Sequence, residues 1–242
     1  MKLVFVFDGE APLLKKKTRE MRADAKKEAV AKFEEAQQAG DIVGMRKFAG
    51  RTSVLTSEMI AESKELLRLL GVPVVQAPSE GEAQAAFMTQ KGDAYAAVSQ
   101  DFDSLLSGSV RLVRNLSIEG KKKQAGKLAY SIVQPEMLVL DDVLASLGVT
   151  REQLVVIGIL VGTDYAPGGV TGIGPKKALK LVKEEKNFDV IFKKLEWKTY
   201  FDFAWTDVYD TIMKMPVTSD YELSWRSADA DKIRAMLVEG HS

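Results

Sequence analysis

KLVFVFDGE, residues 2–10, is the stretch that decides the fold. Its apolar first half predicts a buried strand over 2–7, and Asp8-Gly9 predicts a turn directly after that strand. Outward from it, helices and strands alternate: a helix is predicted over 57–70, strands over 72–77, 94–99 and 110–116, and a helix over 79–90. This alternation predicts an α/β fold with a parallel-rich central sheet flanked by helices.

Acidic side chains follow three of the predicted strands. They are Asp8 after the first, Glu80 and Glu82 after the second, and Asp101 and Asp103 after the third; Asp164 ends a predicted helix over 153–162. Because the carboxyl ends of parallel strands meet at one edge of a sheet, we expect the strand-end acids to lie close together. Two carboxylates about 4 Å apart repel by roughly 4 kcal/mol at an effective dielectric constant of about 20, so such a cluster requires protons or cations between the acids.

Oxygen ligands define the chemistry of this expected site. Carboxylates bind hard ions, which predicts Mg²⁺, with Mn²⁺ as a substitute, rather than zinc or copper. Two such ions can activate water and stabilise the leaving oxygen in phosphodiester hydrolysis. The strand-end acids also have structural interpretations: Ser79 and Glu82 fit a capping box, Glu80 suits the dipole of a first helical turn, Asp8 fits a turn, and Asp101 and Asp103 fit a solvated loop. Three consecutive strand ends that all carry acids favour the metal site.

The composition excludes several catalytic classes. The 242 residues contain no cysteine, and the single histidine is His241. Thiol nucleophiles, thiolate zinc sites, disulfides and Ser-His-Asp triads are therefore excluded. No apolar run reaches the roughly 20 residues that span a bilayer, and the N-terminus lacks a signal-peptide layout, so we expect a soluble intracellular protein with no membrane partner.

The formal net charge is zero, but the basic residues are concentrated in two zones. Residues 15–51 hold eleven Lys and Arg against six acids, in one or two predicted helices over 12–48 with a break at Gly40 or Gly44. These residues are interpreted as a basic arch whose Lys15, Arg19 and Arg22 contact phosphates of a single strand. The alternative is a solvated, charged helical hairpin.

The second basic zone follows a glycine-containing turn. Beyond Pro135 the pattern predicts helices over 135–147, 151–162, 175–185 and 188–194, after a polar loop over 121–127. Between two of them lies GIGPKK, whose Gly172 and Gly174 let backbone N–H groups approach an anion at a helix N-terminus, beside Lys176 and Lys177. We expect phosphate-backbone binding there; a tight helix-helix connection is the alternative.

Four motifs of the chain resemble those of the flap endonucleases of the XPG superfamily, particularly archaeal ones. The motifs are VFDGEAP (Val6–Pro12), APSEGEAQA (Ala77–Ala85), VSQDFDSLL (Val98–Leu106) and VGTDYAPGGVTGIGPKKAL (Val161–Leu179). They occur in the order found in the family, and the likeness covers essentially the whole chain.

The resemblance implies a fold, an activity and a set of residues. The implied fold is a PIN/XPG-like nuclease core over 1–134 with a helical arch insertion at about 12–52, then a helical DNA-binding module over 135–242 with a helix-three-turn-helix element at about 151–186. The implied activity is 5′-flap endonuclease and 5′-to-3′ exonuclease cleavage of DNA in replication and repair. The implied metal ligands for two Mg²⁺ ions are Asp8, Glu80, Glu82, Asp101, Asp103 and Asp164.

Other roles follow from the same resemblance. Lys15 and Arg22 match arch residues that place the scissile phosphate, whereas Gly172 and Gly174 match an element that binds downstream duplex and a monovalent cation such as K⁺. The implied partners are branched DNA and a sliding clamp, for a monomer in the cytoplasm of an archaeon-like cell or in a nucleus. Family members also have an N-terminal region with a further strand and metal-binding aspartate, and a clamp-binding tail; neither is found between Met1 and Ser242.

Two other functions remain open. Without the further aspartate the chain could bind branched DNA and not cut it, and EDTA-sensitive cleavage would exclude this reading. A PIN-type ribonuclease shares the acidic strand ends, and a preference for flapped DNA over single-stranded RNA would exclude that one.

Overall fold

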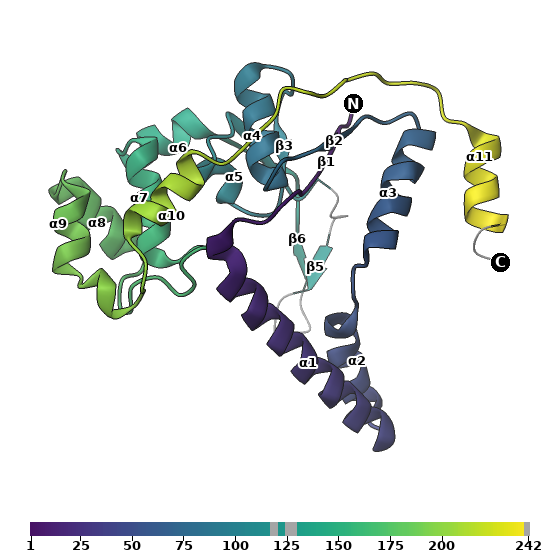
Figure 1. Cartoon of the computed structure of the whole chain (residues 1–242), viewed down its shortest axis with the longest axis horizontal. Coiled ribbons are helices and arrows are strands. Elements are labelled where there is room, and N and C mark those ends of the chain that lie inside the picture. Colours follow the sequence, from purple (N-terminus) through teal and green to yellow (C-terminus); the bar gives the residue numbers. More distant parts are fainter. Residues whose placement is uncertain (117–120, 124–129, 240–242) are drawn as a thin grey trace. The chain divides into compact units, whose positions relative to one another are not determined.

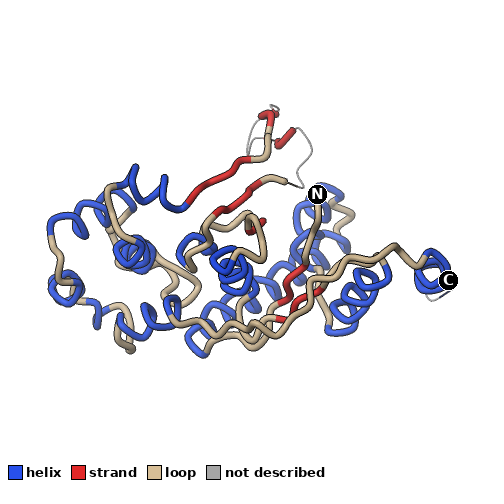
Figure 2. Tube along the Cα trace, turned by 90° about the horizontal axis from the view of Figure 1, so that it is seen from above, coloured by secondary structure: helices blue, strands red, loops and turns tan. Residues whose placement is uncertain are grey.

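The computed structural model describes residues 1–116, 121–123 and 130–239, as an α/β chain that is rich in helices (Figure 2). The chain divides into two compact units. The first unit comprises residues 1–5, 15–75 and the C-terminal residues from 220; the second comprises residues 6–14 and 76–219.

β1 (Phe5–Phe7) and β2 (Val74–Gln76) form a two-stranded sheet. The Phe5 N–H donates to the Pro73 carbonyl at 3.1 Å, and the Ala77 N–H donates to the Phe7 carbonyl at 2.9 Å. These bonds advance in the same direction along both strands, which is the parallel pattern. The parallel pairing expected of strands joined by a long crossover is therefore confirmed.

The basic residues of the predicted arch over 15–51, apart from Lys15, lie on two helices joined by a tight connection. After a 3₁₀ turn (Leu13–Lys15), α1 (Lys16–Gln38) and α2 (Ile42–Thr52) lie side by side (Figure 1). Gly40 has φ +65°, and the Asp41 side chain caps α2 by accepting from the Gly44 N–H at 2.9 Å. The predicted break is confirmed at Gly40, whereas Gly44 is buried inside α2.

α3 (Ser57–Leu69) completes the first unit together with the C-terminal segment. The Thr56 side chain caps its start, and Gly71, with φ +71°, follows its end. The Arg226 N–H donates to the Gly71 carbonyl at 3.0 Å, and the Trp225 indole donates to the Leu3 carbonyl at 2.8 Å. The chain then forms α11 (Ala230–Arg234), which continues as one π-helical turn (Ala235–Glu239).

The larger sheet lies in the second unit. β3 (Ala97–Val98) pairs in parallel with β4 (Arg111–Arg114), and β4 pairs in antiparallel fashion with β7 (Glu136–Val139). The helix predicted over 135–147 is therefore wrong at its start, since only α6 (Leu140–Leu147) is helical. Pairing explains the difference, because it places Leu138 opposite the buried Leu112 in one apolar cluster.

A second correction concerns the predicted polar loop over 121–127. β5 (Lys121–Lys123) pairs in antiparallel fashion with β6 (Tyr130–Ile132), so the first three of those residues form a strand. Charged residues disfavour a strand by local propensity, and cross-strand pairing overrides that preference. Residues 124–127 lie outside the described part of the chain.

Four helices build the main core of the second unit. They are α7 (Arg151–Val161), α8 (Pro175–Glu184), α9 (Phe188–Lys194) and α10 (Trp205–Met213), with a 3₁₀ turn at Trp197–Thr199. A capping box of Thr150 and Gln153 starts α7, and aromatic rings fill the space between α9 and α10, where Phe192 stacks on Trp205 at 4.5 Å. The first three helices match the prediction; α10 was not predicted.

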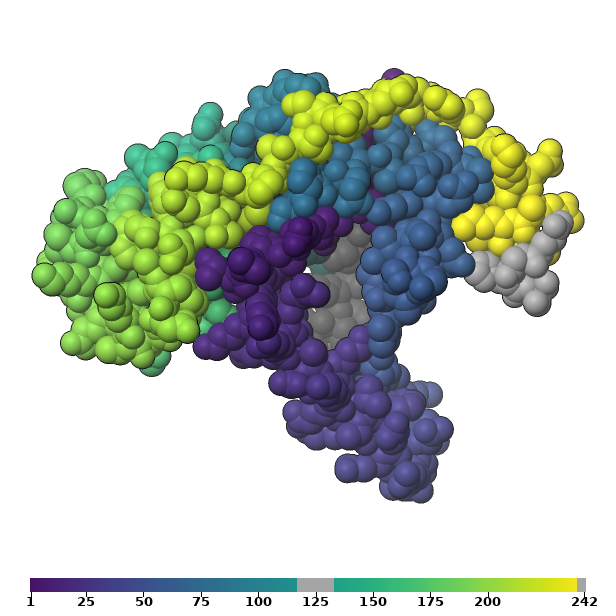
Figure 3. All heavy atoms as spheres, viewed as in Figure 1, coloured from purple at the N-terminus to yellow at the C-terminus, as the bar shows by residue number. Residues whose placement is uncertain are grey.

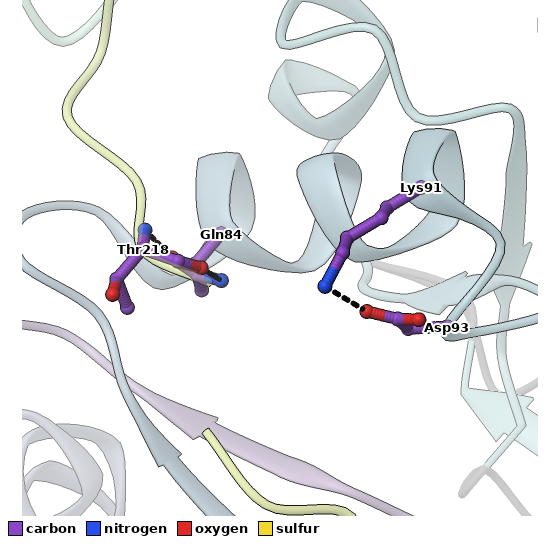
Figure 4. A network of polar contacts seen from close by, with 4 residues as sticks. All are labelled: Gln84, Lys91, Asp93 and Thr218. Atoms are coloured by element: carbon purple, nitrogen blue, oxygen red, sulfur yellow. Dashed lines mark hydrogen bonds and ion pairs between the residues drawn. The ribbon is translucent and has the colours of Figure 1, made fainter. Parts of the chain in front are cut away.

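α4 (Gly81–Lys91) is covered by the extended segment that follows α10 (Figure 3). The fully buried Gln84 joins the two: its amide donates to the Thr218 carbonyl at 2.9 Å and its carbonyl accepts from the Thr218 N–H at 2.8 Å (Figure 4). One side chain therefore satisfies both backbone groups of a residue that lies in no helix or strand.

Replacing Gln84 with alanine is expected to lower the free energy of unfolding by about 2–6 kcal/mol, because two partly buried backbone groups lose their partners at about 1–3 kcal/mol each. Urea unfolding followed by circular dichroism measures this. Lys91→Ala is the matched control on the same helix, because its exposed 2.9 Å ion pair with Asp93 is worth less than about 1 kcal/mol (Figure 4). Equal losses in the two variants would contradict the role given to Gln84.

No single helix among the described residues has the length and apolar composition to cross a membrane. α6 and α7 meet these criteria only as a pair, and the two helices are bent by 76°.

Candidate metal centre

A turn after β1 places Asp8 against the start of α4. The Gly9 N–H donates to the Ser79 carbonyl at 2.6 Å, and the Glu10 N–H donates to the Pro78 carbonyl at 3.0 Å. The Asp8 Oδ1 atom then accepts from the Gly81 N–H at 2.6 Å. An acid from a distant strand thus caps α4, where the helix dipole favours negative charge.

This arrangement overturns the predicted capping box of Ser79 and Glu82. The Ser79 hydroxyl donates to the Glu10 carbonyl at 2.7 Å, and the N-cap residue of α4 is Glu80, whose side chain makes no capping bond. The local pattern misled because a residue 69 positions earlier in the chain accepts the Ser79 hydroxyl. Ser79 and Glu82 therefore do not form the capping box.

Glu82, Asp101 and Asp103 form a carboxylate triad. One oxygen atom from each lies within 4.8 Å of the others. A chain of hydrogen bonds orders the triad: the Ser99 hydroxyl donates to Glu82 and accepts from the Asp101 N–H at 3.0 Å, and Asp101 Oδ1 accepts from the Asp103 N–H at 3.2 Å. The residues come from α4, from the turn after β3 and from the first position of α5 (Asp103–Leu106).

Four of the predicted metal ligands affect the pKa of Tyr165. Burial raises the pKa of the Tyr165 hydroxyl, and the negative charges of Glu80, Asp103, Asp164 and Glu82 raise this pKa further. A phenol feels such charges only at short range in a partly buried setting. Glu80, as the N-cap residue of α4, and Asp8, through its bond from the Gly81 N–H, lie at the start of the helix that carries Glu82. Asp164 directly precedes Tyr165 in the chain.

The triad fits a hard divalent cation. Ligands of one Mg²⁺ ion at about 2.1 Å lie at most about 4.2 Å apart, so small side-chain rotations bring the three oxygen atoms into range. All donors are carboxylate oxygens, and histidine and cysteine are absent from the described residues. Like charges so close together are stabilised by bound cations.

Comparison with known proteins identifies the family. The XPG I-region matches residues 71–164. Flap endonuclease 1 of Thermofilum pendens is 52% identical over 241 residues, which cover 100% of this chain and 69% of that protein. This chain belongs to the flap endonuclease 1 family. Flap endonuclease 1 of Hyperthermus butylicus is 51% identical, again over 100% of this chain and 69% of the relative.

Solved structures of the family agree with the fold. Flap endonuclease-1 from Methanococcus jannaschii superposes with a TM-score of 0.69 and 40% identity, over 98% of this chain and 69% of that one. The catalytic core of Rad2 in complex with DNA substrate superposes with a TM-score of 0.64 and 25% identity, over 96% and 72% of the two chains. The nuclease fold predicted from the sequence is therefore confirmed.

The glycine turn of this flap endonuclease relative has one position that requires glycine. Gly172 has φ +80°, whereas Gly174, with φ −91°, is the N-cap of α8 and is followed by Pro175 at the first helical position. A Cβ atom at either glycine would meet no atom within 4 Å, so the turn is open to a ligand. The Lys177 ammonium donates to the Gly172 carbonyl at 2.9 Å and keeps donors for an anion.

The structure gives the positions of the arch residues within the first unit only. Lys15 ends the 3₁₀ turn, and Arg19 and Arg22 follow on α1, where both are exposed. They belong to the first unit, and the carboxylates belong to the second. Contact of these cations with a phosphate held at the carboxylates stays a prediction.

Sequence reasoning missed Ser99 and Tyr165. Ser99 joins Glu82 to Asp101, and the pKa of the Tyr165 hydroxyl is raised by burial and by the charges of four carboxylates. Ser99 carries a recognisable signal, since a serine two residues before an aspartate favours a side-chain turn. The position of Tyr165 depends on tertiary packing, so no local pattern indicates it.

Proposed function

We propose that this chain is a structure-specific 5′-flap endonuclease and 5′-to-3′ exonuclease that hydrolyses DNA phosphodiester bonds with two Mg²⁺ ions in replication and repair. The observation that carries the proposal is the meeting of Glu82, Asp101 and Asp103 within 4.8 Å in a chain 52% identical to a flap endonuclease 1. The Rad2 core, solved with its DNA substrate, supports DNA as the substrate class.

In the proposed mechanism the protein provides ligands and fixed charges. Asp8, Glu80, the triad and Asp164 would hold the ions, and the Ser99 hydroxyl orients the Glu82 carboxylate. When bound, two Mg²⁺ ions supply an activated water and stabilise the leaving oxygen. Lys15 and Arg22 would stabilise charge on the scissile phosphate.

DNA positioning is assigned to the remaining basic elements. Arg19 on the arch, Lys176 and Lys177 on α8, and the backbone of Gly172 and Gly174 would contact phosphates, with K⁺ as a candidate ion at the glycine turn. The chain would act as a monomer where DNA is replicated, in an archaeal cytoplasm or a nucleus. We further propose a nuclease core over 1–134 and a DNA-binding module over 135–242.

Cleavage assays on the purified chain test the proposal. Labelled 5′-flap duplex, linear duplex and single-stranded RNA are incubated with Mg²⁺, with Mn²⁺, or with EDTA. Preferential cleavage of the flap, abolished by EDTA, is expected. Salt-sensitive binding without any product would favour a non-cutting branched-DNA binder, and preferential RNA cleavage would favour a PIN-type ribonuclease; either result contradicts the proposal.

Lys176→Ala is expected to weaken flap binding uniformly across DNA sequences and to reduce the slope of log K against log[salt] by about 0.9, the value for one phosphate contact on duplex DNA. Fluorescence anisotropy between low and moderate salt measures this slope. Lys214→Ala is the control, because that exposed lysine, directly after α10, pairs with Asp210 at 2.8 Å. An unchanged slope for Lys176→Ala would remove Lys176 from the DNA-binding surface.

A further inference from the structure

An aromatic side chain lies in the middle of the candidate metal centre. Phe102 stands between Asp101 and Asp103, directly before α5, and is 51% exposed. Large apolar side chains at half exposure contribute little to a core, and Phe102 belongs to neither of the buried clusters found among the described residues. Its position is therefore not explained by packing.

Arg114 holds the ring in place. The guanidinium lies 4.2 Å from the centre of the Phe102 ring, within the range of a cation–π contact. The same guanidinium is fixed by two further interactions: its Nε donates to the Gln100 carbonyl at 3.3 Å, and its Nη1 lies 3.4 Å from the Glu136 carboxylate. The ring is thus supported from the sheet and remains half open to solvent.

A nucleobase is the group that suits a half-exposed aromatic ring beside a phosphate-binding centre. Every nucleobase has a flat face, so an aromatic side chain can stack on the base next to a bound phosphate without regard to sequence. Arg114 limits the ring's freedom in advance, which reduces the entropy lost when a base binds.

We propose that Phe102 is a stacking contact for the nucleobase that flanks the phosphate held at the carboxylate triad, with Arg114 as its positioning residue. The inference rests on the proposed nuclease function, because that function brings a DNA phosphate to the triad. Phe102 would contact a base, whereas the other proposed DNA contacts of this chain are made to phosphates.

The chain offers a matched control. Tyr95 is 69% exposed, and the Arg111 guanidinium lies 4.5 Å from its ring centre, so it forms a second arginine–aromatic pair. Tyr95 precedes β3, whereas Phe102 follows it, so the two rings lie beyond opposite ends of the same strand. Of the two rings, only Phe102 is next to acids of the carboxylate triad, Asp101 and Asp103.

The experiment measures binding of labelled flap DNA to the full chain in Ca²⁺. Three substrates are compared: the intact flap, a flap with one abasic nucleotide on the 5′ side of the junction, and a flap with one abasic nucleotide on its 3′ side. Phe102→Ala is expected to weaken binding of intact DNA about tenfold, within the range for one lost stack, and to have little effect on the DNA that lacks the stacked base. Phe102→Leu keeps apolar bulk without an aromatic face and should behave like Phe102→Ala. Tyr95→Ala should bind every substrate like the parent chain.

Three results would overturn the inference. They are unchanged binding of intact DNA by both Phe102 variants, equal loss on intact and on all abasic substrates, and an equal loss for Tyr95→Ala. The outcome is separable from that of the proposed function, because binding in Ca²⁺ needs no cleavage, whereas EDTA-sensitive cutting of flaps tests the nuclease without reference to Phe102.

Discussion

Asp103→Ala is expected to reduce Mg²⁺-dependent cleavage of flap DNA by about a thousandfold. Asp103 contributes one of three carboxylate oxygens that lie within 4.8 Å of one another, and it is the first residue of α5. Removing a ligand weakens the electrostatic stabilisation of the transition state by several kcal/mol, and about 4 kcal/mol corresponds to three factors of ten in rate. Single-turnover cleavage of a labelled 5′ flap measures the effect.

A control variant distinguishes the loss of a proposed metal ligand from the loss of one negative charge elsewhere on the chain. Asp142→Asn also removes one acid, but Asp142 is exposed in the first turn of α6 and belongs to no predicted site. Its cleavage rate should match that of the parent chain. Asp103→Ala should bind flap DNA in EDTA at least as tightly as the parent, because one carboxylate that repels phosphate is gone. If Asp103→Ala still cleaved flap DNA at the parent rate, the proposal that Asp103 is a metal ligand would be wrong.

The predictability of the fold depended on how local its determinants are. α3 and α7 were predicted within a few residues, because the helical spacing of apolar residues is a local feature of the sequence. β7 was misread as a helix, because its structure is decided by pairing with β4, more than 20 residues earlier in the chain. α10 was missed because its Trp205 ring packs against Phe188 and Phe192 of α9, a tertiary contact, and no strong local pattern marks the helix.

The candidate site shows the same division. The meeting of Glu82, Asp101 and Asp103 was predicted from the rule that parallel strands deliver their ends to one edge of a sheet. The three carboxylates do meet, although β2 and β3 lie in separate sheets. The details did not follow. Asp8 caps α4 and Ser79 bonds Glu10, although the local sequence favours Ser79 as the cap. Both bonds cross between distant stretches of chain, and single-sequence patterns carry no information about such contacts.

Gly9→Ala is expected to lower the free energy of unfolding by at least about 3 kcal/mol, the upper part of the range for overpacking. A Cβ atom at Gly9 would lie 2.2 Å from the Ala77 carbonyl oxygen and 2.5 Å from that of Pro78. Both are backbone atoms, so no rotation of a flexible side chain relieves the clash. The turn must open, and the bonds that Gly9 and Glu10 donate to Ser79 and Pro78 would break.

The same change should weaken metal binding, because opening this turn moves Asp8 away from the Gly81 N–H. Urea unfolding and Mn²⁺ titration measure the two effects. Gly50→Ala is the control: the added Cβ would meet no atom within 4 Å on exposed α2, and alanine should stabilise that helix by about 0.5–1 kcal/mol. Unchanged stability of Gly9→Ala would show that the turn tolerates a side chain, and the placement of Asp8 by close backbone approach would then be wrong.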